Sequence, residues 1–199
     1  MKYKLEAEKN RLATFLLSGE EFDQHLFDSY SPKVVLHADA ALKLKTEGCQ
    51  VVIGVKNGGL RYSKVFEMMG YEQSEIDYSH HKRKMQEPLI EDEELEKLRG
   101  KKVILTDNDF VTGITLQRIV EYLREREVNV GAAYMGLDCW PGIEDICNSG
   151  FWITGKNGLR ELNEDLEKRF FNGLKIYTST EKVRTREAKK RVLNYLLKV

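Results

Sequence analysis

The sequence predicts an α/β protein whose central, mostly parallel sheet is flanked by helices. Two apolar runs of strand length, "VVIGV" and "VILT", are each followed by a turn of small and polar residues and then by a stretch with helical periodicity. Successive strand–turn–helix units are joined by right-handed crossovers, so their strands are expected to be parallel in one sheet. A third apolar run, "NVGAAYMGLD", follows the second unit and extends the pattern.

The first unit occupies residues 49–70. Its β-branched run "CQVVIGV" is long enough for a buried strand, and "NGGL" ends that strand. The stretch "LRYSKVFEMMG" then places its apolar residues on one helical face and ends at Gly70. A further helix, ending at Gly48, is expected in "KVVLHADAALKLKTEG", directly before this unit.

The second unit begins with "VILT" and continues into the helical stretch "LQRIVEYLREREV". The segment that separates the two units, residues 71–102, is the most polar part of the chain. Its first portion is compatible with a strand around Ile76 and Tyr78, and Glu91 to Leu98 is typical of a short acidic helix. A basic cluster, "HHKRK", lies between these two elements.

The two ends of the chain show weaker patterns. Residues 1–30 are mostly helical in pattern, and after Trp140 the periodicity loosens. A helix is expected near residues 159–170, followed by a strand in "GLKIYTST" and a terminal helix.

The chain is expected to form one domain, residues 1–199, with its core at about residues 32–140. The ends, about residues 1–31 and 141–199, would form a small appendage. Its 32 basic residues balance 32 acidic ones, so the chain has no overall field that would gather nucleic acid or an anionic membrane. A small anion bound at a local site is therefore a better candidate partner than a polymer.

Cysteine usage and hydropathy indicate the compartment. The chain has 3 cysteines, an odd number without paired metal-type spacing, which argues against a disulfide framework and a zinc site. The amino-terminal stretch "MKYKLEAEKNRL" lacks the apolar core of a secretory signal, and no apolar run approaches the roughly 20 residues of a membrane span. We therefore expect a soluble protein of the cytoplasm.

The most informative stretch is "VILTDNDFVTGIT". Ligands of open parallel sheets bind beyond the carboxyl ends of the strands, and Asp107, Asn108 and Asp109 lie at that end of "VILT". The turn Val111–Thr115 leads into a helix, so its backbone N–H groups and the positive end of the helix dipole favour a phosphate. Carboxylates repel phosphate, so their presence here indicates a ligand with hydroxyl groups or a metal beside the phosphate, such as a sugar phosphate with Mg²⁺.

This stretch resembles the phosphoribosyl pyrophosphate (PRPP) motif of type I phosphoribosyltransferases: four apolar residues, two acids, three variable residues and Thr-Gly-x-Thr. In that resemblance Asp107 occupies the first acidic position and Asn108 the second, where they hold the ribose hydroxyls, with Asp109 beside them. The loop that binds the 5-phosphate would consist of Val111, Thr112, Gly113, Ile114 and Thr115.

The resemblance extends upstream and covers about residues 34–137. "VVIGVKNGGL" is similar to the strand and loop that hold pyrophosphate, and the loop would consist of Lys56, Asn57, Gly58 and Gly59. Tyr78 to Lys84 corresponds in position and charge to the mobile loop that closes over PRPP, where Arg83 or Lys84 would neutralise the departing pyrophosphate. The order of these segments is more specific than any one motif, and the chain ends would supply the family's variable hood.

The resemblance implies a Rossmann-like fold and transfer of 5-phosphoribosyl from PRPP to a nitrogen nucleophile, expected to be a nucleobase, with release of pyrophosphate. Mg²⁺ would be the cofactor, bound at Asp107 mostly through substrate and water. Trp140 is a candidate for stacking on the base, with a core tryptophan as the equal alternative. Homodimers are common in the family, so a homodimer is the implied assembly.

Two departures from the family pattern leave alternatives open. Asn108 removes one of the two carboxylates, and Val111 stands where 6-oxopurine transferases carry an acid that handles the base proton. The first alternative is a non-catalytic regulator that senses PRPP or a nucleotide on the same fold, because fold does not determine turnover. The second is a phosphosugar or nucleotide hydrolase on a similar sheet.

Overall fold

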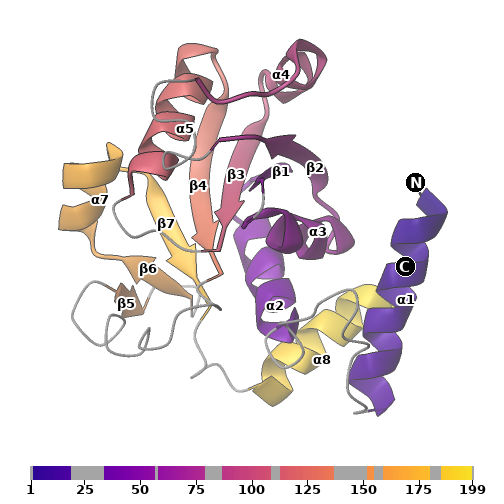
Figure 1. Ribbon diagram of the computed structural model, residues 1–199. Coiled ribbons are helices and arrows are strands. Elements are labelled where there is room, and N and C mark those ends of the chain that lie inside the picture. Colours follow the sequence, from indigo (N-terminus) through magenta and orange to yellow (C-terminus); the bar gives the residue numbers. More distant parts are fainter. Residues whose placement is uncertain are drawn as a thin grey trace.

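The computed structural model describes residues 2–18, 34–56, 58–78, 87–108, 113–136, 152–154, 159–179 and 185–198. Figure 1 shows its helices and strands in space. The helices are α1 (Lys2–Ser18), α2 (Val34–Lys45), α3 (Leu60–Met68), α4 (Asp92–Leu98), α5 (Ile114–Glu125), α7 (Glu164–Phe171) and α8 (Thr185–Leu196). The strands are β1 (Val51–Val55), β2 (Glu72–Ile76), β3 (Lys102–Asp107), β4 (Asn129–Met135), β5 (Trp152–Thr154), β6 (Arg160–Leu162) and β7 (Lys175–Thr178).

The described strands form one sheet in the order β2-β1-β3-β4-β7-β6-β5. The pairs β2–β1, β1–β3, β3–β4 and β4–β7 are parallel, whereas β6 and β5 continue the sheet as antiparallel strands. This arrangement confirms the predicted α/β class with a mostly parallel sheet. The division into a core and an appendage stays a prediction; β7, from the carboxyl-terminal part of the chain, pairs with β4 in the parallel sheet.

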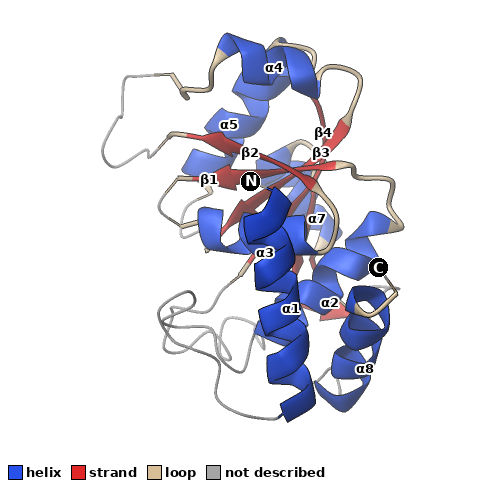
Figure 2. Cartoon of the chain, turned by 90° about the vertical axis from the view of Figure 1, so that its right-hand side faces the viewer, coloured by secondary structure: helices blue, strands red, loops and turns tan. Residues whose placement is uncertain are grey.

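Helices cover both faces of the sheet, which Figure 2 shows between α4 and α5 on one side and α1, α2, α3 and α8 on the other. Strand side chains alternate between these layers because successive residues of a strand point to opposite faces. Val52 and Ile104 join the cluster built with α1, α2, α3 and α8. Val51, Ile53 and Leu105 join the opposite cluster with residues of α4, α5 and α7. β1 and β3 are therefore buried on both faces, as their continuous apolar sequences predict.

An ion pair between a buried carboxylate and a partly exposed guanidinium joins α2 to α8. The carboxylate of Asp39 is 2% exposed and accepts two hydrogen bonds from Arg191, from Nε at 2.6 Å and from the second guanidinium nitrogen at 2.9 Å. The ammonium of Lys43 lies 3.0 Å from the same carboxylate. Burial alone would raise the pKa of Asp39, but the hydrogen bonds from Arg191 and Lys43 outweigh burial and hold the pKa below its usual value.

The helix expected near residues 159–170 begins later than predicted. Arg160–Leu162 forms the strand β6, which pairs with β7, and α7 starts at Glu164. The side chain of Asn163 accepts a hydrogen bond from the backbone N–H of Asp165 at 2.9 Å and so caps α7 at that point. The sequence pattern does not reveal β6, because a strand of three residues is too short to show a periodicity of its own.

Within the part of the chain that the structure describes, none of the helices is both long enough and apolar enough to span a membrane.

Candidate active site

The crevice between the ends of β1 and β3 is the expected ligand site of this sheet. β1 and β3 are neighbours in the sheet. From β1 the chain continues to β2 on one side of this pair, and from β3 it continues to β4 on the other side. The direction of the strand order therefore reverses between β1 and β3, which makes their junction the topological switch point. The connection after β1 leads into α3 on one face, and the connection after β3 leads into α5 on the other. Both predicted ligand-binding turns therefore start at the same place.

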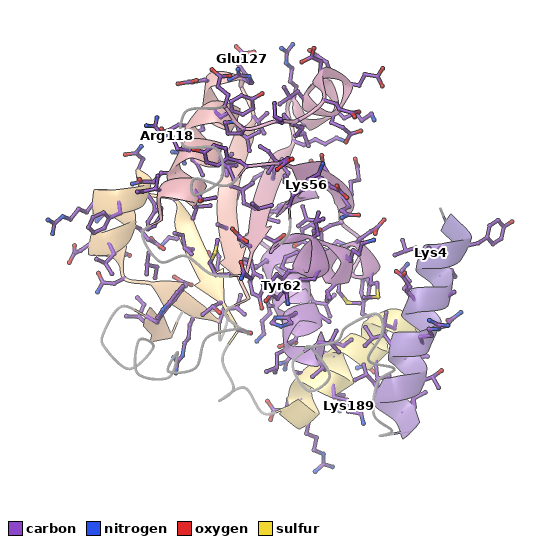
Figure 3. The ribbon with its side chains drawn as sticks, viewed as in Figure 1. Lys4, Lys56, Tyr62, Arg118, Glu127 and Lys189 are labelled. Atoms are coloured by element: carbon purple, nitrogen blue, oxygen red, sulfur yellow. The ribbon has the colours of Figure 1, made fainter. Side chains whose placement is uncertain are left out.

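The turn after β1 is anchored by its backbone. Gly59 N–H donates to the carbonyl of Val55 at 2.7 Å, and Lys56 N–H donates to the carbonyl of Ile76 in β2 at 2.9 Å. Figure 3 labels Lys56, the first residue after β1, and Tyr62, in the first turn of α3. The side chain of Lys56, the first residue after β1, is exposed.

Glycine is required at position 59, where the turn lies directly against the backbone of β3, whereas a side chain at position 58 would displace neighbouring side chains. A Cβ added to Gly59 would overlap the carbonyl oxygen of Thr106 and lie 2.7 Å from the backbone nitrogen of Val55. A Cβ added to Gly58 would overlap the Oδ1 atoms of both Asp107 and Asn108. The predicted pyrophosphate turn and the predicted acidic strand end are therefore in contact.

The acidic strand end is held in place on two sides. The hydroxyl of Thr106 is buried and donates to the carbonyl of Gly59 at 3.0 Å. The carbonyl of Asp107 accepts from the N–H of Gly136, just after β4, at 2.9 Å. The carboxylate of Asp107 accepts from the backbone N–H of Asn108 at 2.8 Å, which orients the Asp107 side chain. Both side chains are half-buried at the crevice.

The amino terminus of α5 supplies the third part of the site. Gly113 is the residue before the helix and has φ +75°, a left-handed conformation that glycine adopts without a steric penalty. Ile114 and Thr115 form the first turn of α5, whose positive dipole end favours an anion. The start of α5 therefore lies beyond β3, as expected for the carboxyl end of the loop that would bind a phosphate.

Several predicted site residues lie outside the described residues: Asn57, Arg83, Lys84, Asp109, Val111, Thr112 and Trp140. The residues on both sides of the segment with Arg83 and Lys84 are described. At its base, Asp77 and Leu89 exchange two backbone hydrogen bonds, of 2.9 and 3.0 Å. Asp77 directly follows β2, which is the neighbour of β1.

Two residues at the crevice were not selected from the sequence. The sequence pattern predicts only that Thr106 belongs to a buried strand and that Arg61 belongs to a helix. The Nε–H of Arg61 donates to the carbonyl of Gly58 at 3.2 Å, and its guanidinium lies 5.8 Å from the centre of the Tyr62 ring. A basic residue two positions after a Gly-Gly turn was the available signal for Arg61.

The side-chain oxygen atoms of Asp107 and Asn108 fit a hard cation such as Mg²⁺ that takes its remaining ligands from water and substrate. Asp107 and Asn108 both place a side-chain oxygen beside Gly58. Within the described residues no group of three or more histidine, cysteine or acidic side chains forms a metal cage. Mg²⁺ commonly binds through one or two protein oxygens, with waters and substrate phosphates completing its coordination, and this pair fits that mode.

These features define an α/β protein with a mostly parallel sheet, in which the turn after β1 contacts the end of β3 at the switch point. No family model matches the sequence, and no curated protein matches it. Among solved structures, the chain is similar to a purine phosphoribosyltransferase from Pyrococcus horikoshii at 24% identity and a TM-score of 0.38, over 52% of this chain and 72% of the other.

The chain is also similar to a hypoxanthine phosphoribosyltransferase from Staphylococcus aureus, at 19% identity and a TM-score of 0.38, over 53% of this chain and 61% of the other. A third similar structure is glutamine PRPP amidotransferase from B. subtilis in complex with ADP and GMP. That match has 14% identity and a TM-score of 0.44, over 80% of this chain and 37% of the other. Less than two thirds of each of these two proteins is therefore matched, and the similarities concern fold alone.

Proposed function

We propose that the protein is a phosphoribosyltransferase that transfers the 5-phosphoribosyl group from PRPP to a nitrogen nucleophile, a nucleobase or a related compound, and releases pyrophosphate. The observation that supports this proposal most directly is the contact of Gly58 with Asp107 and Asn108 at the switch point. In PRPP the pyrophosphate group is attached to the ribose, whose hydroxyls lie beside it. A glycine turn that can bind pyrophosphate, in contact with an acid that can bind hydroxyls, suits such a ligand.

In the proposed complex each part of PRPP has its own binding segment. Pyrophosphate lies on the turn Lys56–Gly59, with Lys56 contributing a positive charge. The ribose hydroxyls bind Asp107 and Asn108, with Asp109 nearby. The 5-phosphate lies on Val111–Thr115 at the positive end of α5. The sequence order of these segments and the contact of Gly58 with Asp107 and Asn108 support this orientation.

The reaction needs positioning and charge stabilisation more than covalent chemistry from the protein. The bond between the anomeric carbon and pyrophosphate breaks, and its electron pair leaves with pyrophosphate. The nitrogen lone pair then forms the new bond to the same carbon, and the proton that this nitrogen loses passes to water or to the released pyrophosphate. The carboxylate of Asp107 stabilises the positive charge that develops on the sugar ring, because it is fixed by the N–H of Asn108 before the reaction starts.

The leaving pyrophosphate carries negative charge that must be neutralised. Bound Mg²⁺, held by Asp107 and Asn108 together with substrate and water, would supply part of this neutralisation. Arg83 and Lys84 would supply the rest, from a segment whose base at Asp77 and Leu89 lies at the same sheet edge. Trp140, from the segment that follows β4, is the proposed stacking partner of the base.

The proposed setting is a reducing cytoplasm. Cys49 is a buried free thiol, and burial raises its pKa, which lowers the fraction of reactive thiolate.

The proposed assembly is a homodimer, which size-exclusion chromatography with light scattering would test.

A pyrophosphate-release assay with PRPP, Mg²⁺ and a panel of nucleobases tests the proposal, together with calorimetric titration of PRPP. We expect release with at least one base, and a large loss of release or of PRPP affinity in Asp107→Ala. Asp92→Ala is the matched control, since it removes an exposed carboxylate from the first turn of α4, before β3 rather than after it. Wild-type behaviour of Asp107→Ala in both assays would refute the site.

The second candidate is a regulator that binds PRPP or a nucleotide without turnover. Asn108 favours it, because an amide cannot supply the second negative charge at the acidic strand end. PRPP binding without release of pyrophosphate for any base would support the regulator. Absence of PRPP binding in the presence of Mg²⁺ would exclude both candidates.

A further inference from the structure

The contact of Phe171 with Gly113 connects α7 to the proposed 5-phosphate turn. Gly113 has φ +75°, and a Cβ added to it would lie 2.7 and 2.8 Å from Cζ and Cε1 of the Phe171 ring. The ring therefore occupies the space beside the glycine that a side chain would otherwise fill. Phe171 is the last residue of α7 and is 6% exposed.

A second contact links the same two helices. The side-chain amide of Gln117, in the first turns of α5, donates to the carbonyl of Phe170. Gln117 N–H in turn donates to the carbonyl of Gly113 at 2.9 Å. The end of α7 thus reaches both the glycine before α5 and the residue that closes its first turn.

The end of α7 is itself fixed to the sheet. The buried carboxylate of Glu167 accepts the N–H of Ile176 in β7 at 3.1 Å, and the ammonium of Lys175 lies 3.4 Å from it. Asn172 follows Phe171 in a left-handed conformation with φ +50°, which ends the helix directly after the ring. The position of Phe171 therefore follows from the attachment of α7 to β7.

We infer that Phe171 is a positioning residue of the proposed phosphate site: its ring holds Gly113 in the conformation from which the anion-binding turn enters α5. This inference rests on the proposed function for its ligand, PRPP, but its geometric part concerns only α5 and α7. The turn binds a phosphate best when its backbone is ordered in advance, since ordering one residue on binding has a free-energy cost.

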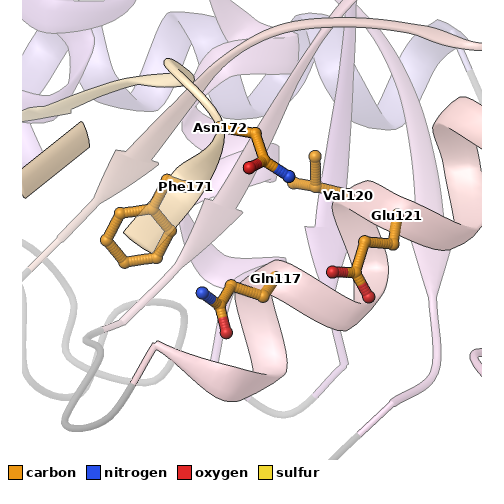
Figure 4. Close-up of a pocket in the computed structure, with 5 residues that line it drawn as sticks. All are labelled: Gln117, Val120, Glu121, Phe171 and Asn172. Atoms are coloured by element: carbon orange, nitrogen blue, oxygen red, sulfur yellow. The ribbon is translucent and has the colours of Figure 1, made fainter. Parts of the chain in front are cut away.

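The surroundings of Phe171 indicate that a smaller residue is tolerated. The ring borders a small, partly open pocket between α5 and α7 that is also lined by Gln117, Val120, Glu121 and Asn172 (Figure 4). Removing the ring would enlarge this existing pocket rather than create a sealed cavity, and the loss of stability depends on how well a site can relax. Phe171→Ala is therefore expected to fold, with Phe171→Leu as the milder variant.

The first experiment compares Phe171→Ala with Phe170→Ala. Phe170 is the adjacent aromatic residue, but it is 42% exposed and lies against Arg169. We expect Phe171→Ala to weaken PRPP binding about tenfold and to raise the KM for PRPP with little change in kcat, because the substrate must then order the turn. We expect Phe170→Ala to leave both within about twofold. Equal PRPP affinities in the two variants would overturn the inference.

The second experiment is a double-mutant cycle with Gly113→Ala. In the wild-type background the added methyl group meets the Phe171 ring, whereas in Phe171→Ala it does not. The loss of PRPP affinity caused by Gly113→Ala is therefore expected to be smaller in the Phe171→Ala background. Strict additivity would contradict a direct contact between the two positions.

Hydrogen–deuterium exchange separates this inference from the proposed function, since it needs no ligand. Amides of residues 113–117 are expected to exchange faster in Phe171→Ala than in the wild type or Phe170→Ala. If the wild type fails to bind PRPP, the proposed function fails while the exchange data still test the positioning role. Unchanged exchange at these amides would refute that role.

Discussion

Gly59 and Thr106 lie in backbone contact across the ends of two neighbouring strands. A Cβ added to Gly59 would overlap the carbonyl oxygen of Thr106, while the Thr106 hydroxyl donates to the Gly59 carbonyl at 3.0 Å. The turn after β1 is thereby locked to the end of β3, one residue before Asp107. The geometry of the proposed pyrophosphate turn and that of the proposed ribose site are consequently set together.

We expect Gly59→Ala to separate these two segments. The methyl group cannot be accommodated without a backbone shift, which costs about 1–3 kcal/mol of stability in packed sites. PRPP affinity is expected to fall further than stability, because the turn would move away from Asp107. Chemical denaturation and calorimetric titration measure the two effects.

Gly48→Ala is the control for the substitution itself. Gly48 has φ +80° but no atom within 4 Å of an added Cβ, so its cost is only that of alanine in a left-handed conformation, about 1 kcal/mol. PRPP affinity is expected to be unchanged in this variant. A loss of PRPP affinity as large as that of Gly59→Ala would show that the effect is not local to the crevice.

Asn108→Asp tests whether one missing carboxylate limits turnover. The Oδ1 atoms of Asp107 and Asn108 both lie beside Gly58, so a carboxylate at position 108 would be close to that of Asp107. We expect the variant to be less stable without ligand, because of repulsion between like charges, and to gain more stability than the wild type from Mg²⁺ with PRPP. Thermal unfolding with and without ligand measures this, and an equal ligand-induced shift in both proteins would contradict it.

The same variant also bears on the choice between enzyme and regulator. A rate of pyrophosphate release that rises in Asn108→Asp would indicate that the natural asparagine reduces transition-state stabilisation. The exposed change Asn194→Asp in α8 is the matched control for the added charge and is expected to leave release unchanged.

The sheet and the place of the crevice were predictable from the sequence because both depend on local signals. Apolar runs followed by helical periodicity identify β1 with α3 and β3 with α5, and parallel strands bring their carboxyl ends to one edge. The acid at Asp107 and the glycines at 58 and 59 could thus be assigned to one site.

Contacts between distant segments were not predictable in this way. Phe171 and Gly113 are far apart in the sequence, and no local pattern places α7 against the start of α5. The same holds for Asp39 and Arg191, since each looks like an ordinary charge on an amphipathic helix until the helices pack. Side-chain direction and the order of β7 in the sheet decide such contacts, and both depend on the whole fold.

We expect Arg191→Met to destabilise the protein by about 2–3 kcal/mol. Removal of one partner of a fully buried ion pair typically costs about 3–5 kcal/mol, but the Arg191 side chain is 42% exposed and Lys43 remains beside Asp39, and both reduce the loss. Lys190→Met, an exposed change on the same helix, is expected to stay within about 0.5 kcal/mol of the wild type. Urea denaturation compares the two, and equal stabilities would contradict a structural role for the pair.

The Asp39 carboxylate also predicts a pH dependence. Its pKa in the folded protein lies below the usual 3.8, so the folded state favours the charged form more than the unfolded state does. The stability that this carboxylate contributes is fully present above pH 3.8 and is lost as the pH falls through the lower folded pKa. The difference in unfolding free energy between the wild type and Asp39→Asn is therefore expected to be constant near neutral pH and to shrink below pH 3.8. Urea denaturation across this range measures the difference, and a constant or growing difference toward acid pH would show that Asp39 is not held in its charged form by Arg191 and Lys43.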